Sequence, residues 1–261
     1  MRILFIGDIV GRPGRQAIAR VLPEWRERYA PDIILANGEN SAGGNGMTPQ
    51  VAEELFALGI AGFTMGNHVW DKKEIYPLLD SDPRIARPAN YSPLAPGKGV
   101  IFFEVLDKKL AVISMAGRVF MELADCPFRT FDQIYAQLDT PFVFVDFHAE
   151  TTAEKATFSA YLDGRASAVV GTHTHVQTAD ERILPKGTAF ISDVGMCGVF
   201  NSSIGMDMEV SLQRFLTGLP IRLEVTKGSP LVACGVLIDL DRTTGRALSI
   251  QRLQKRFEVG G

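Results

Sequence analysis

The chain has 261 residues, of which 46% are hydrophobic and 22% are charged, with a formal net charge of −3. This composition is typical of a globular protein with a sizeable core and excludes a fibrous or disordered chain. The nearly balanced charge and the lack of a basic run argue against a groove that tracks a long nucleic acid. A small anionic ligand is still compatible with it.

The three cysteines, Cys126, Cys197 and Cys234, are widely spaced and form no CxxC pair. They therefore predict neither a disulfide framework nor a zinc finger, and they favour a cytoplasmic location. The N-terminal RILFIGD is too short for a signal-peptide core, and no apolar run approaches the length of about 18 residues that a membrane span needs. We expect neither secretion nor membrane insertion.

The first 70 residues alternate short apolar runs with helical segments, which is the pattern of a parallel sheet. Strands are predicted at ILFIG, IILAN and GFTMG. Helices are predicted from about residue 14 to 29 and from Thr48 to Gly59. Thr48 can cap the second helix, and Pro49 lies where a missing N–H donor has little cost.

From Val100 onward, strands follow one another with few helices between them. VIFFEVLDKKLAVISM predicts two strands about a tight turn, and FVFVDF, ASAVVG, TAFISD, IRLEV, LVACGVLIDL and ALSIQRL predict further strands. A total of about ten strands exceeds one comfortable open sheet. We therefore predict an α/β protein with two stacked sheets and helices outside, in a single domain over residues 1–261.

Polar side chains cluster where the apolar runs end, and all four histidines of the chain lie there. In open α/β sheets, the carboxyl ends of parallel strands form the crevice where ligands bind. His173 and His175 are two residues apart, so an extended chain would send both rings to the same side. The candidate set consists of Asp8, Glu39, Asn40, Asn67, His68, His148, His173 and His175.

Each of these residues, taken singly, has a structural interpretation such as a turn, a cap or a hydrogen-bonded core histidine. Together they would bring carboxylates, amides and imidazoles into one crevice, where burial is costly unless a cation shares their lone pairs. The set is large enough for two metal ions. Glu39 is the natural bridge between them.

The segments GD, GEN, GNH, an isolated His after a strand, and GTHTH occur in the order found in the calcineurin-like metallophosphoesterases, which this chain resembles. NGENSAGGNGMT, TMGNHVWD, VDFHAETTAEK and VVGTHTHVQTAD resemble more closely the YmdB-like family of bacterial cyclic-nucleotide phosphodiesterases, over nearly the whole chain. The resemblance implies a four-layer αββα sandwich of two mixed sheets, a dinuclear metal centre and hydrolysis of small phosphodiesters, with 2′,3′-cyclic nucleotides as the substrate class.

The resemblance also implies a role for each candidate residue. One metal would be held by Asp8, Glu39, Asn40 and His175, and the other by Glu39, Asn67, His148 and His173. The sequence departs from the wider superfamily at Val10, where a histidine is usual, and at Glu39, where an aspartate is usual. An oxygen of Asn40 in place of the missing imidazole would make the first position harder, which favours manganese or iron over zinc.

In such a centre, hydroxide held between the two metals would attack phosphorus, and His68 would protonate the leaving oxygen as the general acid. A phosphomonoesterase using the same centre is one alternative. A regulatory module that binds a metal and a nucleotide without turnover is another, and a hydrolase of amide bonds is a third. The sequence leaves open the native metals, the base preference and the oligomeric state, a homo-oligomer included.

Overall fold

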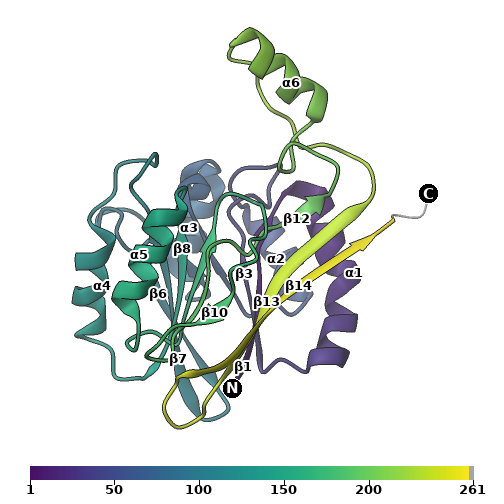
Figure 1. Ribbon diagram of the computed structural model, residues 1–261. Helices are drawn as coiled ribbons and strands as arrows, with labels where there is room; N and C mark the ends of the chain where they lie inside the picture. The colour runs from purple at the N-terminus through teal and green to yellow at the C-terminus, as the bar shows by residue number, and fades with distance from the viewer. Residues whose placement is uncertain (259–261) are drawn as a thin grey trace.

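The computed structural model describes residues 1–258, which form two facing β-sheets with helices on both outer sides (Figure 1). Within these residues the first sheet has eight strands, in the order β2-β12-β13-β1-β3-β4-β5, and β14 pairs with β13. The second sheet has six described strands, in the order β10-β11-β9-β8-β7-β6. Both sheets are mixed: β1, β3, β4 and β5 are parallel in the first, and β7, β8, β9 and β11 in the second.

The strands of the first sheet are β1 (Arg2–Ile6), β2 (Asp8–Ile9), β3 (Ile33–Asn37), β4 (Gly62–Thr64), β5 (Ile85–Ala86), β12 (Met196–Val199), β13 (Leu231–Leu240) and β14 (Ala247–Phe257). Those of the second are β6 (Val100–Val105), β7 (Lys108–Ala116), β8 (Phe142–His148), β9 (Ala168–Thr172), β10 (Arg182–Ile183) and β11 (Ala189–Ile191). The helices are α1 (Gly11–Tyr29), α2 (Pro49–Ala57), α3 (Tyr76–Ser81), α4 (Pro127–Tyr135), α5 (Thr152–Leu162) and α6 (Met208–Thr217), with 3₁₀ turns η1 (Asn67–Trp70) and η2 (Lys73–Ile75).

The structure has four layers, helices, sheet, sheet and helices, and an apolar cluster lies between each neighbouring pair. One packs α1, α2 and α3 against the first sheet, and another packs α4 and α5 against the second. The third lies between the sheets, where the rings of Phe5 and Phe144 have centroids 5.2 Å apart. The predicted αββα sandwich is therefore confirmed. Within residues 1–258, the structure contains no helix that is both long and apolar enough to span a bilayer.

Local sequence signals account for several elements. The predicted cap at Thr48 is confirmed, since its side chain accepts a hydrogen bond of 3.3 Å from the Val51 amide. The two strands predicted after Val100 form an antiparallel pair, and Leu106 and Asp107 both have positive φ at the turn. The strand predicted at IRLEV is wrong. Residues 221–225 make only an isolated bridge from Val225 to Met206 and pair with neither sheet.

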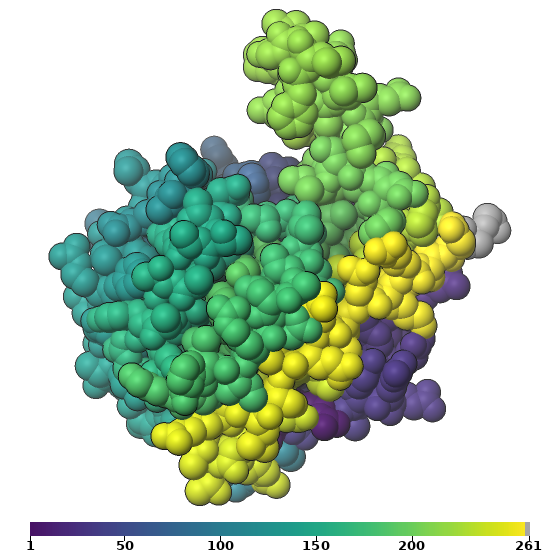
Figure 2. Space-filling model, in the orientation of Figure 1, coloured from purple at the N-terminus to yellow at the C-terminus, as the bar shows by residue number. Residues whose placement is uncertain are grey.

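The connection between β12 and β13, residues 200–230, forms an arm that stands away from the body of the molecule (Figures 1 and 2). Its helix α6 begins after Asp207, whose side chain caps the Val210 amide at 3.0 Å, and ends at Gly218 in the left-handed conformation. Ser211 is the one residue of α6 that is buried. The arm therefore has few tertiary contacts of its own and presents most of its side chains to solvent.

The ring pair between the sheets yields a stability prediction. Phe144→Ala removes a fully buried ring, so we expect the free energy of unfolding to fall by about 3–5 kcal/mol. The matched control is Phe120→Ala, because that side chain is 89% exposed, and its effect should stay within about 0.5 kcal/mol. Equilibrium unfolding in denaturant measures both. Equal losses in the two variants would contradict the placement of the core between the sheets.

Candidate metal centre

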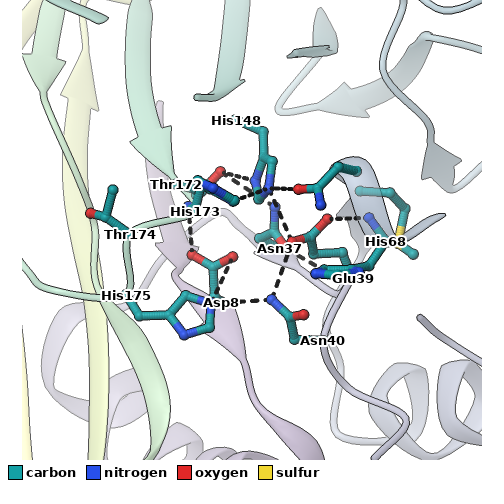
Figure 3. Close-up of polar contacts among 12 residues, drawn as sticks. Asp8, Asn37, Glu39, Asn40, His68, His148, Thr172, His173, Thr174 and His175 are labelled. Atoms are coloured by element: carbon teal, nitrogen blue, oxygen red, sulfur yellow. Dashed lines mark hydrogen bonds and ion pairs between the residues drawn. The ribbon is translucent and has the colours of Figure 1, made fainter. Parts of the chain in front are cut away.

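The carboxyl ends of the parallel strands in both sheets meet at one place, and the predicted site residues converge there (Figure 3). The first sheet supplies the carboxylates and amides, and the second supplies the imidazoles of His148, His173 and His175. The positions are the start of β2 for Asp8, the turn after β3 for Glu39 and Asn40, η1 for Asn67 and His68, the end of β8 for His148, and the loop after β9 for His173 and His175. The structure thus brings all eight predicted residues together.

The surroundings of the His148 Nε2 atom are the clearest sign of a cation site. Three atoms with lone pairs surround it: Asn67 Oδ1 at 3.0 Å, Glu39 Oε1 at 3.0 Å and His173 Nδ1 at 3.1 Å. One proton on Nε2 can serve only one of them well, whereas a metal ion would satisfy all four atoms at once. Ligand atoms of Glu39, His148 and His173 also lie within 4.8 Å of one another. This group fits a metal ion.

The hydrogen bonds beneath His148 fix which ring nitrogen faces the centre. Thr172 Oγ1 donates to Asp146 Oδ1 at 2.7 Å. With its proton used there, Thr172 Oγ1 accepts at 2.8 Å from His148 Nδ1, which must therefore carry hydrogen. In the neutral ring the lone pair then resides on Nε2, the atom that faces Glu39.

The other two imidazoles are oriented in the same way. His173 Nε2 lies 3.0 Å from Glu150 Oε2, which leaves Nδ1 to face the centre. His175 Nδ1 donates to the carbonyl oxygen of Ile204 at 2.8 Å, so its Nε2 faces the centre. Metal-binding histidines commonly have an outer hydrogen bond of this kind, because it fixes the ring and its tautomer. Each inward nitrogen is thus prepared to act as a ligand.

A second group of polar atoms lies beside the first. Asp8 Oδ1 is fully buried and has no hydrogen-bond partner among residues 1–258; the nearest basic atom is His175 Nε2 at 3.8 Å. Asn40 Nδ2 lies 3.2 Å from Glu39 Oε1 and 3.2 Å from His175 Nε2. Rotation of this amide by half a turn would direct Oδ1 inward. Val10 is buried in an apolar cluster and contributes nothing polar here.

The pKa values of Glu39 and His148 show that the centre favours a positive charge. Burial alone would raise the pKa of Glu39, but the charge and hydrogen bond of His148 lower it to about 2. Burial opposes a charge on His148, yet Glu39 raises the pKa of this imidazole to about 9. Burial raises the pKa of Asp8 to about 6 in spite of the neighbouring histidines. The buried carboxylates therefore favour a positive charge at this position, which is the property that a cation site needs.

The backbone of the histidine loop differs from the expected extended chain. His173 has φ of +102° and His175 has φ of +66°, so the chain turns at each histidine. The side chain of Asp193 maintains this shape: its Oδ2 accepts from the Thr174 amide at 3.0 Å and from the Thr174 hydroxyl at 2.7 Å. Asp193 is itself buried and paired with Lys155 at 2.9 Å. Strain of this kind is typical of functional sites.

Glycine is required where the chain passes closest to the centre. A Cβ on Gly66 would lie 2.3 Å from Glu39 Oε2 and 2.4 Å from His148 Nε2. Any larger residue would therefore displace the very atoms that face the cation position. The glycine before Asn67 is explained by this close approach.

His68 lies at the rim of the centre and has the most exposed imidazole of the candidates, at 38% against 23% for His173. Its amide donates to Glu39 Oε2 at 3.1 Å, and its Nδ1 lies 2.9 Å from Asp71 Oδ2. A cavity of about 460 Å³ opens beside it, and Glu39, Asn40, His173 and His175 also line this cavity. The volume is within the range of small-molecule sites.

Sequence reasoning missed the residues that orient the histidines. Glu150 and Asp71 each lie within three residues of a candidate, so a search for nearby carboxylates could have found them. The same search would also have found Asp146, two residues before His148, but not its role, and Thr172 is not a carboxylate. Thr172 lies directly opposite His148 in the β8–β9 register, which the sequence does not reveal.

A model of the YmdB-like protein family matches residues 4–253. The chain belongs to this family. A relative from Bacillus subtilis, named 2′,3′-cyclic-nucleotide 2′-phosphodiesterase, is 49% identical over 255 residues, covering 97% of this chain and 96% of that protein. The resemblance seen in the motifs is therefore confirmed.

Solved structures agree with the family assignment. A hypothetical protein from Thermus thermophilus has a TM-score of 0.93 and 42% identity, with 98% of this chain and 99% of that chain covered. A 5′-nucleotidase from Candida albicans has a TM-score of 0.56 at 10% identity, over 97% of this chain and 50% of that chain. The second likeness concerns the fold alone.

The contact between Thr172 and His148 yields a prediction for metal affinity. Thr172→Val keeps the side-chain shape but removes the acceptor that holds His148 Nδ1–H, so we expect metal affinity to fall roughly 10- to 100-fold. Competition with a chelator measures it. Thr140→Val is the control, since its hydroxyl bonds the Lys109 carbonyl oxygen. Unchanged affinity in a folded Thr172→Val protein would refute the proposed orientation of His148.

Proposed function

We propose that this chain is a metal-dependent phosphodiesterase that hydrolyses nucleoside 2′,3′-cyclic phosphates and breaks the bond to the 2′ oxygen. As the relative named for this reaction is 49% identical, the chain is a phosphoric ester hydrolase. One observation supports this proposal best: two atoms suited to bind cations lie beside a cavity that His68 lines. These atoms are Asp8 Oδ1, which is buried without a hydrogen-bond partner among residues 1–258, and His148 Nε2, which faces three atoms with lone pairs. Such an arrangement provides cation sites, space for a substrate and a proton donor.

Two metal ions fit the residues. One would be held by Asp8, Glu39, Asn40 and His175, and the other by Glu39, Asn67, His148 and His173. When bound, these ions would supply Lewis acidity that activates water and neutralises charge on the phosphoryl oxygens. The predominance of oxygen ligands at the first position favours manganese or iron over zinc.

Residues of the chain itself protonate the leaving group and disfavour the binding of long nucleic acids. Because Nδ1 of His68 is occupied by Asp71, Nε2 is the atom that donates a proton to the leaving sugar oxygen. The chain has a net charge of −3 and no run of basic residues that could follow a long nucleic acid. Substrate binding must therefore depend on the single phosphate at the centre. A small cyclic diester suits that arrangement.

The remaining inferences concern context. We infer that residues 1–261 act as a single domain, because one apolar cluster is shared by both sheets. We infer a cytoplasmic location from Cys126, Cys197 and Cys234, all free thiols. A phosphomonoesterase and a non-catalytic binding module are the alternatives that the first experiment decides between.

The first experiment combines elemental analysis with a substrate panel. Protein purified without chelator should contain close to two transition-metal ions per chain. With manganese loaded, kcat/KM should be higher for 2′,3′-cyclic AMP than for 3′,5′-cyclic AMP, a nucleoside monophosphate or single-stranded RNA, and the product should be the 3′-phosphate. Preference for the monophosphate would replace the proposal with a phosphomonoesterase. Full metal loading with no turnover of the panel would favour the binding module.

The second experiment separates binding from proton transfer. His68→Ala should keep its metals, while turnover of 2′,3′-cyclic AMP should fall by roughly 10²- to 10⁴-fold, as is typical of a lost general acid. An aryl phosphodiester serves as the internal control, since its phenolate leaves with little need of a proton. The activity of His68→Ala on this ester should therefore fall much less. Equal losses on both esters would show that His68 instead positions the phosphate or a metal.

A further inference from the structure

The cavity beside the metal centre has two walls of different character. The wall formed by the body carries the carboxylate, amide and imidazole groups of the centre. The other wall comes from the arm, whose helix projects from the body (Figure 2). The arm residues in this wall are Ser203, Ile204, Met206, Ser211, Arg214, Phe215 and Leu223. A ligand whose phosphate lay at the centre would therefore extend toward apolar groups, a hydroxyl and a guanidinium.

Ser211 is the first sign that the arm wall is built for a ligand. It is only 3% exposed although its helix stands off the body, and its Oγ has no hydrogen-bond partner among the described residues. A buried hydroxyl without a partner is destabilising, and such groups in native proteins need an explanation. A polar atom of a bound ligand would provide the missing partner.

Phe215 is the second sign. It lies four residues after Ser211 on α6, and both residues line the cavity together with Arg214, so one helix face meets the ligand space. Its ring is 83% exposed, so most of its surface is free to contact a ligand. Leu212 and Leu216 of the same helix are also exposed but do not line the cavity.

We propose that this face of α6 is the nucleoside subsite: the base stacks on Phe215, and Ser211 Oγ hydrogen-bonds a polar atom of the base or ribose. A nucleobase matches these groups because its faces stack on aromatic rings and its edges carry donors and acceptors. Arg214 lines the same cavity and adds positive charge that attracts an anionic substrate. This inference rests on the proposed function and names the part of the chain that selects a nucleotide over other phosphodiesters.

The test compares two substrates with the same five-membered cyclic phosphodiester. 2′,3′-Cyclic AMP carries a base, and glycerol 1,2-cyclic phosphate does not. In Phe215→Ala, the ratio of kcat/KM for the nucleotide to that for the glycerol ester should fall roughly 10-fold, the size expected for a lost stacking contact. Leu216→Ala is the matched control on the same helix, and its ratio should stay within about twofold of wild type.

A ratio that is unchanged in Phe215→Ala would overturn the subsite. So would a change of oligomeric state in sedimentation without a change of ratio, because the face would then be a contact between copies of the chain. If wild type turns over neither ester, the proposed function fails, and titration calorimetry with adenosine 3′-phosphate still tests the subsite. Weaker binding by Phe215→Ala supports it, and equal binding overturns it.

Ser211→Ala distinguishes a ligand contact from a structural role. Because Ser211 Oγ makes no hydrogen bond within the described residues, its removal should leave Tm unchanged or slightly higher. The same variant should bind adenosine 3′-phosphate several-fold more weakly. A lower Tm with unchanged affinity would assign the hydroxyl to the packing of the arm and contradict its part in the subsite.

Discussion

The rest of the centre depends on the hydrogen bonds that the carboxylate of Asp146 accepts. It is fully buried between the sheets and accepts hydrogen bonds from both: from Asn37 at 3.0 Å and Thr64 at 2.5 Å in the first sheet, and from Thr172 at 2.7 Å in the second. Apolar packing between sheets has no preferred register, whereas these bonds have fixed directions. Asp146 therefore fixes the alignment of the two sheets immediately beneath His148.

That alignment matters because neither sheet holds the centre alone. Glu39 follows a strand of the first sheet and His148 ends a strand of the second, and their side-chain atoms are 3.0 Å apart. A small shift between the sheets would separate carboxylate from imidazole. The mutual attraction of these groups offsets the cost of their burial only when both sheets are in place, and a bound cation would offset it further. Folding of the sandwich and formation of the centre are thus one event, and metal should stabilise the whole fold.

The sequence was most informative about side chains that directly follow the ends of strands. The eight candidate residues could be predicted because polar side chains after apolar runs in a parallel sheet must share one edge. The segments that depend on long-range pairing could not be predicted. Thr172 became important only through its register opposite His148, and IRLEV has a strand-like composition but pairs with neither sheet. Likewise, the positive φ of His173 follows from contacts of Thr174 with Asp193, which lies 19 residues further along the chain.

The architecture separates the part that performs chemistry from the part that recognises the rest of the substrate. The ligands are held by strand ends and by buried bonds such as that from Thr172 to Asp146, so a substitution there disturbs both fold and centre. The base of the arm contacts the body through the His175–Ile204 hydrogen bond and through Met206 and Val225. Its helix stands further out and carries Phe215 into the same cavity. Substitutions in its exposed helix have little effect on the core. Substrate preference can therefore change through the arm while the metal centre, and the reaction it supports, remains the same.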